Sequence, residues 1–221
     1  MELLVQWIFV LMQGLVPANA AENASGAVRE TSEARLVRYQ EIAQAAVTVA
    51  FDPSVKPLPE FRGEFARLKT LVLLITIASE ESTFNRDVDL GLDRKNKGKN
   101  DGGESWCMMQ IHLKDSDKYP NRARTVDGWT GPQLVADREK CFRAGLKLMR
   151  WHMKDCNRLP REERLVGYTH GRCTSRAGRS RARYRWGVAV KAWGKHMPEW
   201  KDADFTCTAE NDTACKKEKA G

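Results

Sequence analysis

Residues 71–78 form an almost unbroken apolar run, which stops at the polar sequence 79–82. The run continues the helical spacing of Phe65, Leu68 and Leu71, so it predicts one buried helix from about residue 61 to about residue 81. A carboxyl group at the end of a buried helix lies partly out of water, and desolvation disfavours its charged form. A group that is still protonated near neutral pH suits a general acid. The sequence therefore indicates a proton donor at the end of a rigid apolar helix.

The rest of the chain shows helical rather than strand periodicity. Apolar residues predict further helices at about 32–49, from residue 130 to about 156, at 161–170 and at 183–196. A short apolar element at 106–113 stands between two polar loops, and the long loop at 85–105 is of a kind that is usually functional. The sequence has no alternating apolar run, tandem repeat or domain linker. We therefore expect a mainly α protein with a single domain and long polar loops lining a cleft.

The first twenty residues have the pattern of a secretory signal peptide. Residues 3–16 are apolar apart from Gln6, Gln13 and Gly14, and small residues follow at 17–20. This pattern favours a cleaved signal over residues 1–20, and the apolar stretch is short for a membrane span. However, Glu2 stands where a signal peptide usually carries positive charge. The alternative is an amphipathic helix packed on the domain.

The chain has an even number of cysteines, which together with a signal-like start suggests disulfides and an oxidising compartment. Six cysteines can pair in fifteen ways, and spacing alone favours only a local bridge between Cys207 and Cys215. A zinc site is an alternative for two histidines and two cysteines, but a disulfide between the two cysteines is simpler, and we expect no metal or cofactor. These four residues are His152, Cys156, His170 and Cys173.

The net charge of +8 and the pI near 9.3 favour an anionic partner, which would be nucleic acid, a membrane surface or an acidic cell-wall polymer. A dense arginine stretch could contact phosphates, so a non-catalytic binding protein for the cell envelope or for nucleic acid is one hypothesis. We prefer a role in attracting anionic envelope polymers, and we expect no nucleic-acid partner. The stretch consists of Arg172, Arg176, Arg179, Arg181, Arg183 and Arg185.

Four motifs stand in a distinctive order. They are Glu-Ser-Thr-Phe-Asn at 81–85, Cys-Met-Met-Gln-Ile at 107–111, a helical pattern at 134–148 and Tyr-Thr-His-Gly at 168–171. In this order they resemble the motifs of the soluble lytic transglycosylases, which are relatives of goose-type lysozyme. The resemblance covers about residues 68–193. It implies a lysozyme-like catalytic domain at 61–197, preceded by an N-terminal segment with one helix at 21–60 and followed by a tail at 198–221.

The resemblance implies a peptidoglycan lytic transglycosylase in which Glu81 is the only catalytic carboxylate, first as general acid and then as base. Glu80 is the competing acid, but successive helical residues point about 100° apart, so only one of the two can face a cleft. Met109 and Gln110 would form the cleft floor, and Tyr168 would hydrogen-bond near Glu81 or the sugar. Ser82 would cap or orient the end of the catalytic helix. The alternative for these four residues is ordinary packing or helix termination.

Three positions depart from the family pattern. Cys107 replaces a glycine, Cys141 replaces an asparagine, and Thr169 replaces the asparagine after Tyr168. Since two of these changes introduce cysteines, a Cys107–Cys141 disulfide is expected to compensate for the lost packing and hydrogen bonding. The departures bear on substrate specificity more than on the type of reaction.

Hydrolysis of the same glycosidic bond is the alternative reaction. An inverting hydrolase needs a second carboxylate about 6.5–9.5 Å from the acid to activate water. Either enzyme would act on peptidoglycan glycan strands, in a secreted or periplasmic setting or as part of a phage virion or lysin. Oligomeric state is not predicted. The acids that could supply the second carboxylate are Asp87, Asp89, Asp93 and Asp101.

Overall fold

The computed structural model describes residues 1–19, 30–92, 104–114, 124–196 and 202 of the chain. Most of these residues lie in helices, which confirms the prediction of a mainly α protein. The helices are α1 (Glu2–Leu15), α2 (Ser32–Phe51), α3 (Ala66–Ser82), α4 (Arg86–Asp89), α5 (Gly131–Ala136), α6 (Arg138–Asp155), α7 (Val166–His170) and α8 (Arg176–His196), with a 3-10 turn, η2, at Arg161–Glu163. Strands β1 (Ser105–Trp106) and β2 (Ile111–His112) form an antiparallel hairpin.

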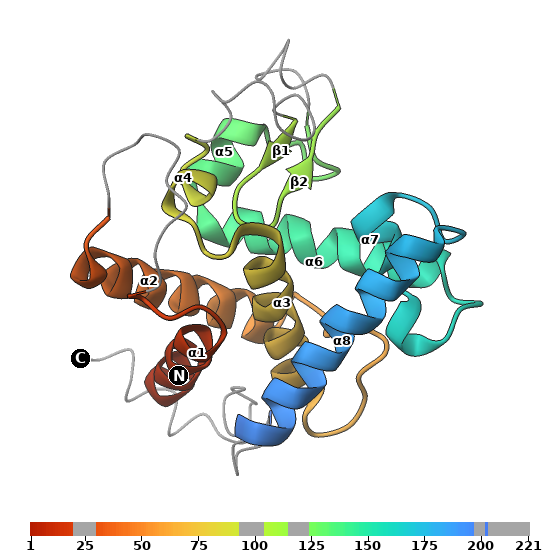
Figure 1. The fold of residues 1–221 in the computed structure, drawn as a ribbon, viewed down its shortest axis with the longest axis horizontal. Helices are drawn as coiled ribbons and strands as arrows, with labels where there is room; N and C mark the ends of the chain where they lie inside the picture. The colour runs from red at the N-terminus through yellow and green to blue at the C-terminus, as the bar shows by residue number, and fades with distance from the viewer. Residues whose placement is uncertain (20–29, 93–103, 115–123, 197–201, 203–221) are drawn as a thin grey trace.

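Helix α3 is the centre of the molecule. It contacts α1, α2, α6 and α8, and in Figure 1 it lies between α2 and α8. Its residues from Thr70 to Ser79 are all buried, because a helix that is apolar all round must be covered on every side. The C-terminal end of the helix points toward α4 and the hairpin (Figure 1).

The start of α3 differs from its prediction. The helix begins at Ala66 rather than near residue 61, because Gly63 takes a left-handed backbone (φ 77°) and the preceding residues form turns. The first backbone amides of a helix lack partners inside it. Here the amides of Arg67 and Leu68 donate to the carboxylate of Asp202, at 2.6 and 3.0 Å. A residue distant in sequence thus caps the central helix.

The predicted third helix is two helices. Asp137 has an extended backbone (φ −141°) that separates α5 from α6, and its side chain accepts from the amide of Lys140 at 3.1 Å. The apolar pattern continued across this break, so periodicity alone could not find it. Two further boundaries also differ. The helix predicted at 161–170 is a 3-10 turn followed by α7, and α8 begins at Arg176 rather than near residue 183.

Two disulfides join the elements around α6. Cys107 in the hairpin turn is bonded to Cys141 of α6, and Cys156 is bonded to Cys173. Both expected bridges are therefore confirmed, while Cys207 and Cys215 lie outside the described residues. Disulfides are typical of proteins in oxidising compartments, which fits a secreted protein.

Helix α1 packs on α2 and α3 with an apolar face. Leu4, Ile8 and Leu11 are almost fully buried, and the hydroxyl of Tyr39 donates to the carbonyl of Val16 at 3.1 Å. This is the arrangement that the alternative to a signal peptide predicts, and cleavage after residue 20 stays a prediction. No helix in the described part of the chain is long and apolar enough to cross a membrane.

Deleting residues 1–20 is expected to lower the free energy of unfolding by several kcal/mol, since each fully buried Leu or Ile contributes roughly 1.5–3 kcal/mol. Urea denaturation of the full chain and of residues 21–221 measures the difference. Equal stability of the two proteins would contradict a structural role for α1. The intact mass of the exported protein tests the cleavage separately.

Candidate active site around Glu81

Glu81 lies in the last turn of α3, and its side chain is 18% exposed. One carboxylate oxygen, Oε1, accepts a hydrogen bond from Nη1 of Arg185 at 2.5 Å. Arg185 comes from α8, and its side chain is only 4% exposed. The resulting ion pair is accessible to solvent mainly from the side of Glu81. Glu80, which precedes Glu81, has no ion pair with any of the residues that the structure describes.

Tyr168 lies near both members of this pair. Its hydroxyl donates to the backbone carbonyl of Met109 at 2.5 Å. Burial raises the pKa of Tyr168 well above its ordinary value, and the negative charge of Glu81 adds to this effect while Arg185 opposes it. The phenol therefore stays protonated and acts as a hydrogen-bond donor across the whole physiological pH range.

Met109 and Gln110, which both lie in the hairpin turn, differ in burial. The Met109 side chain is completely buried and packs against Gly145 of α6, so this side chain contributes packing, while its carbonyl holds Tyr168. Gln110 is partly exposed, and its Nε2 donates to the carbonyl of Cys107 within the turn at 3.1 Å. The Gln110 amide is thus the polar side chain of the turn that a ligand can reach.

Ser82 ends helix α3, which is the alternative role that the sequence left open for it. Its buried hydroxyl donates to the carbonyl of Ala78 at 2.6 Å and accepts from the amide of Phe84 at 3.1 Å. Thr83 and Phe84 then take left-handed backbones, with φ of 49° and 47°. The two hydrogen bonds of the Ser82 hydroxyl therefore stabilise the turn that follows Glu81.

Unusual backbone conformations cluster in these motifs. In the described part of the chain, the non-glycine residues with positive φ are Thr83, Phe84, Cys107 and Gln110. Such conformations cost roughly 1–3 kcal/mol each and gather at functional sites. Cys107 (φ 54°) occupies the position where the transglycosylases have glycine, which takes this conformation at no steric cost. Its disulfide to Cys141 holds the turn against α6.

The four sequence motifs therefore meet in space. Cys107 and Met109 join the second motif to the third through a disulfide and through packing on Gly145. Tyr168 of the fourth motif donates a hydrogen bond to Met109 of the second motif. The charge of Glu81 in the first motif raises the pKa of Tyr168, so these two residues lie close together. Each contact joins segments that are far apart in the chain.

Gly145→Ala is expected to lower the free energy of unfolding by about 1–3 kcal/mol, a usual cost of overpacking. The new Cβ would lie 2.6 Å from Cε and 2.9 Å from Cγ of Met109, whose side chain is fully buried. Gly187→Ala in α8 is the matched control, because nothing lies within 4 Å of its Cβ. The control should be neutral or stabilising by about 0.5–1 kcal/mol in urea denaturation. Equal effects of the two substitutions would contradict the close contact.

The four acids proposed as a second carboxylate have different environments in the structure. Asp89 is 1% exposed, and it is paired with Arg138 at 2.8 Å and with Arg38 at 3.6 Å. It is therefore a member of a buried ion-pair network and is not free to activate water, contrary to that suggestion. Asp87 is partly exposed, with Arg86 3.8 Å away. Asp93 and Asp101 lie outside the described residues.

Asp89→Ala is expected to destabilise the fold by about 3 kcal/mol, because the buried Arg38 and the partly exposed Arg138 lose the carboxylate that they share. Each keeps one other partner, Glu30 and Glu41 respectively. Asp87→Ala, at a partly exposed site, should change the free energy of unfolding by less than about 1 kcal/mol. Thermal or urea denaturation measures both variants. A stable Asp89→Ala variant would contradict the structural role of Asp89.

The arginine stretch is partly neutralised inside the protein. Arg179 and Arg183 pair with Glu163 at 3.8 and 2.7 Å, and Arg185 pairs with Glu81. The remaining arginines of the stretch are exposed and are free to meet an anionic polymer. They are Arg172, Arg176 and Arg181.

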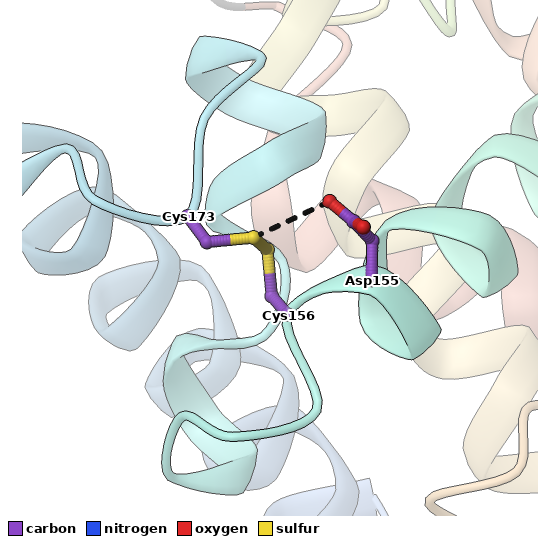
Figure 2. Close-up of side chains that lie close together, drawn as sticks. All are labelled: Asp155, Cys156 and Cys173. Carbon is purple, nitrogen blue, oxygen red and sulfur yellow. Dashed lines mark hydrogen bonds between the residues drawn. A yellow bond between two sulfur atoms is a disulfide. The ribbon is translucent and has the colours of Figure 1, made fainter.

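The zinc alternative is not supported by the cysteines. Figure 2 shows the sulfurs of Cys156 and Cys173 bonded to each other, with Oδ2 of Asp155 3.5 Å from Sγ of Cys173. Disulfide sulfurs are not thiolates, and thiolates are the metal ligands. Burial lowers the pKa of His152, which lies near the ring of Tyr168. The side chain of His170 lies outside the described residues.

Arg185 is the site residue that sequence reasoning missed. It was one of six arginines in a basic stretch, and nothing in their spacing distinguishes the one that turns inward. In the structure, Arg185 lies on the face of α8 that also carries the buried Ala182 and Ala189, three residues before it and four residues after it.

A scan against protein-family models, a search of curated proteins and a search of solved structures each gave no match. The likeness to lytic transglycosylases therefore depends on the four motifs and on the residues that bring them together.

Proposed function

We propose that this protein is a peptidoglycan lytic transglycosylase that cleaves the β-1,4 bond between N-acetylmuramic acid and N-acetylglucosamine. Glu81 is the general acid and then the base. The observation that carries this proposal is the convergence of the four motifs beside Glu81, through the Cys107–Cys141 bridge and the Tyr168–Met109 hydrogen bond. No single motif would support it alone.

The reaction needs one carboxylic acid. Glu81 donates its proton to the glycosidic oxygen, and as that bond breaks the carbonyl oxygen of the muramic N-acetyl group bonds to C1. The Glu81 carboxylate then removes the proton from the C6 hydroxyl of the same sugar. The C6 oxygen displaces the N-acetyl oxygen at C1, which gives a 1,6-anhydro end and returns Glu81 to its acid form. No water is consumed, and no cofactor is required.

The neighbourhood of Glu81 suits a one-carboxylate reaction. Among the residues that the structure describes, the titratable groups beside Glu81 are the guanidinium of Arg185 and the neutral phenol of Tyr168. Asp89, one of the four acids proposed as a second carboxylate, is buried and already paired with two arginines. The exposed arginines of α8 and the net charge of +8 would attract the protein to the anionic polymers of a cell envelope.

Glu81→Gln is expected to lower the rate of glycan cleavage by at least about 100-fold, because an amide of the same size cannot donate or accept the proton. The measurement is mass spectrometry of muropeptides released from purified peptidoglycan by the full chain. Glu80→Gln is the control and should retain activity, since Glu80 points in another direction from the same helix. Equal activity of the two variants would overturn the assignment of Glu81.

The masses of the products identify the reaction. Products lighter by one water than hydrolytic muropeptides are expected for the transglycosylase. Reducing ends would instead show a hydrolase, and no release at all would favour a binding protein.

A further inference from the structure

We propose that a cavity between α3 and α8, at a distance from Glu81, binds the acidic stem peptides that the glycan strands carry. Two cations in its lining, Lys69 and Arg161, form no ion pair within the described part of the chain, and no carboxylate lines the cavity. The choice of stem peptides rests on the proposed function, whereas the cavity and its charge do not. The aliphatic part of the wall is Val72, Leu73, Ala189 and Val190.

Aromatic rings and one backbone carbonyl hold Arg161 in place. The rings of Phe61 and Trp186 are stacked with 5.4 Å between their centroids, and Cζ of Arg161 lies 5.1 and 5.0 Å from these centroids. Nη2 of Arg161 donates to the backbone carbonyl of Glu60, while the Glu60 side chain pairs with Arg164 at 3.5 Å. A guanidinium has five N–H donors in a rigid fork that matches a carboxylate. Arg161 therefore keeps donors for a ligand and is already oriented.

Lys69 is held in a similar way on the α3 side of the cavity. Its Nζ lies 5.6 Å from the ring centroid of Phe65 and 5.4 Å from that of Trp193. Asp202 interacts electrostatically with Lys69, but its two carboxylate oxygens accept the amides of Arg67 and Leu68. The ammonium group of Lys69 is therefore still able to donate to a ligand.

The lack of an acid partner distinguishes these two cations from others on the same helices. Arg143 of α6 pairs with Asp52 at 2.6 Å, and Arg183 of α8 pairs with Glu163 at 2.7 Å. Two uncompensated cations beside one cavity form a surface that is complementary to an anion. The positive charge therefore points to a negatively charged ligand.

The shape and the apolar wall narrow the chemistry of this ligand. The cavity has a volume of about 250 Å³, which is below the roughly 300–1,000 Å³ that encloses a whole drug-sized molecule. It therefore takes a part of a larger molecule. A stem peptide supplies both carboxylates and small apolar side chains. A glycan strand without peptides lacks the carboxylates of the stem, and a phosphate polymer lacks the apolar side chains.

The cavity is separate from the candidate active site. Lys69 precedes Glu81 by twelve residues of α3, which is about 18 Å along the helix axis. Helix α8 packs beside α3 and joins the two places, since Arg185 contacts Glu81 and the neighbouring Trp186 lines the cavity (Figure 1). A peptide in the cavity would thus position a strand from outside the reacting bond.

The test is isothermal titration calorimetry of the full chain with the free stem peptide, which an amidase releases from purified peptidoglycan. The peptide should bind, and its form with amidated carboxylates should bind at least about tenfold more weakly, because charge-assisted hydrogen bonds are lost. Lys69→Met and Arg161→Met should each weaken peptide binding by a similar factor. Lys191→Met is the matched control, because Lys191 is an exposed cation of α8 outside the cavity lining, and affinity should stay within about threefold.

Circular dichroism shows whether each variant is folded. Lys69→Arg keeps the charge and should retain binding. If Lys69→Met does not fold, Arg161→Met, at an exposed side chain, decides the question alone. Absence of peptide binding, or equal binding of the amidated peptide, would overturn the inference. Peptide-free glycan strands and vesicles of anionic lipid are the comparison probes. The inference also fails if either of them binds through Lys69 and Arg161 while the peptide does not.

The free peptide has no glycosidic bond, so its binding is independent of cleavage. An active enzyme that does not bind the peptide would refute only the peptide site. Peptide binding by a protein that cleaves no glycan would refute only the proposed transglycosylase.

Discussion

The burial of α3 on every side is the constraint on which the rest of the structure depends. Four other helices cover it, so its direction is fixed, and Asp202 caps the amides at its start. Glu81 stands at the other end of this rigid helix, where Ser82 and two left-handed residues turn the chain sharply. A side chain in this position has little freedom, and precise placement of the acid is what acid–base chemistry requires.

The remaining parts of the candidate site are fixed by contacts between distant segments. The hairpin turn is strained at Cys107 and Gln110, and the disulfide to Cys141 and the packing of Met109 on Gly145 hold it in place. Tyr168 then fixes α7 to this turn through a single hydrogen bond. The site is therefore assembled from four segments, which are joined by a disulfide, by buried packing and by hydrogen bonds.

Much of the fold could be predicted because the signals are local. Helix α2 has two local signals, its helical period and an N-terminal cap. The cap is Thr31, whose side chain accepts a hydrogen bond from the amide of Ala34. The boundaries that differed depend on interactions without a local pattern. The amides at the start of α3 are capped by Asp202, which is distant in sequence, and the break at Asp137 lies inside a continuous apolar pattern.

The mainly α class and the buried central helix with Glu81 at its end could be predicted from helical periodicity, which is local. The transglycosylase hypothesis came from the resemblance of four motifs in order along the chain. Only the tertiary structure decided that Arg185 turns inward to pair with Glu81, that Asp89 is enclosed between two arginines, and that Met109 acts by packing. Ion pairs and packing contacts across α3, α6 and α8 depend on how helices cross, and no spacing in the sequence encodes the angle of a crossing.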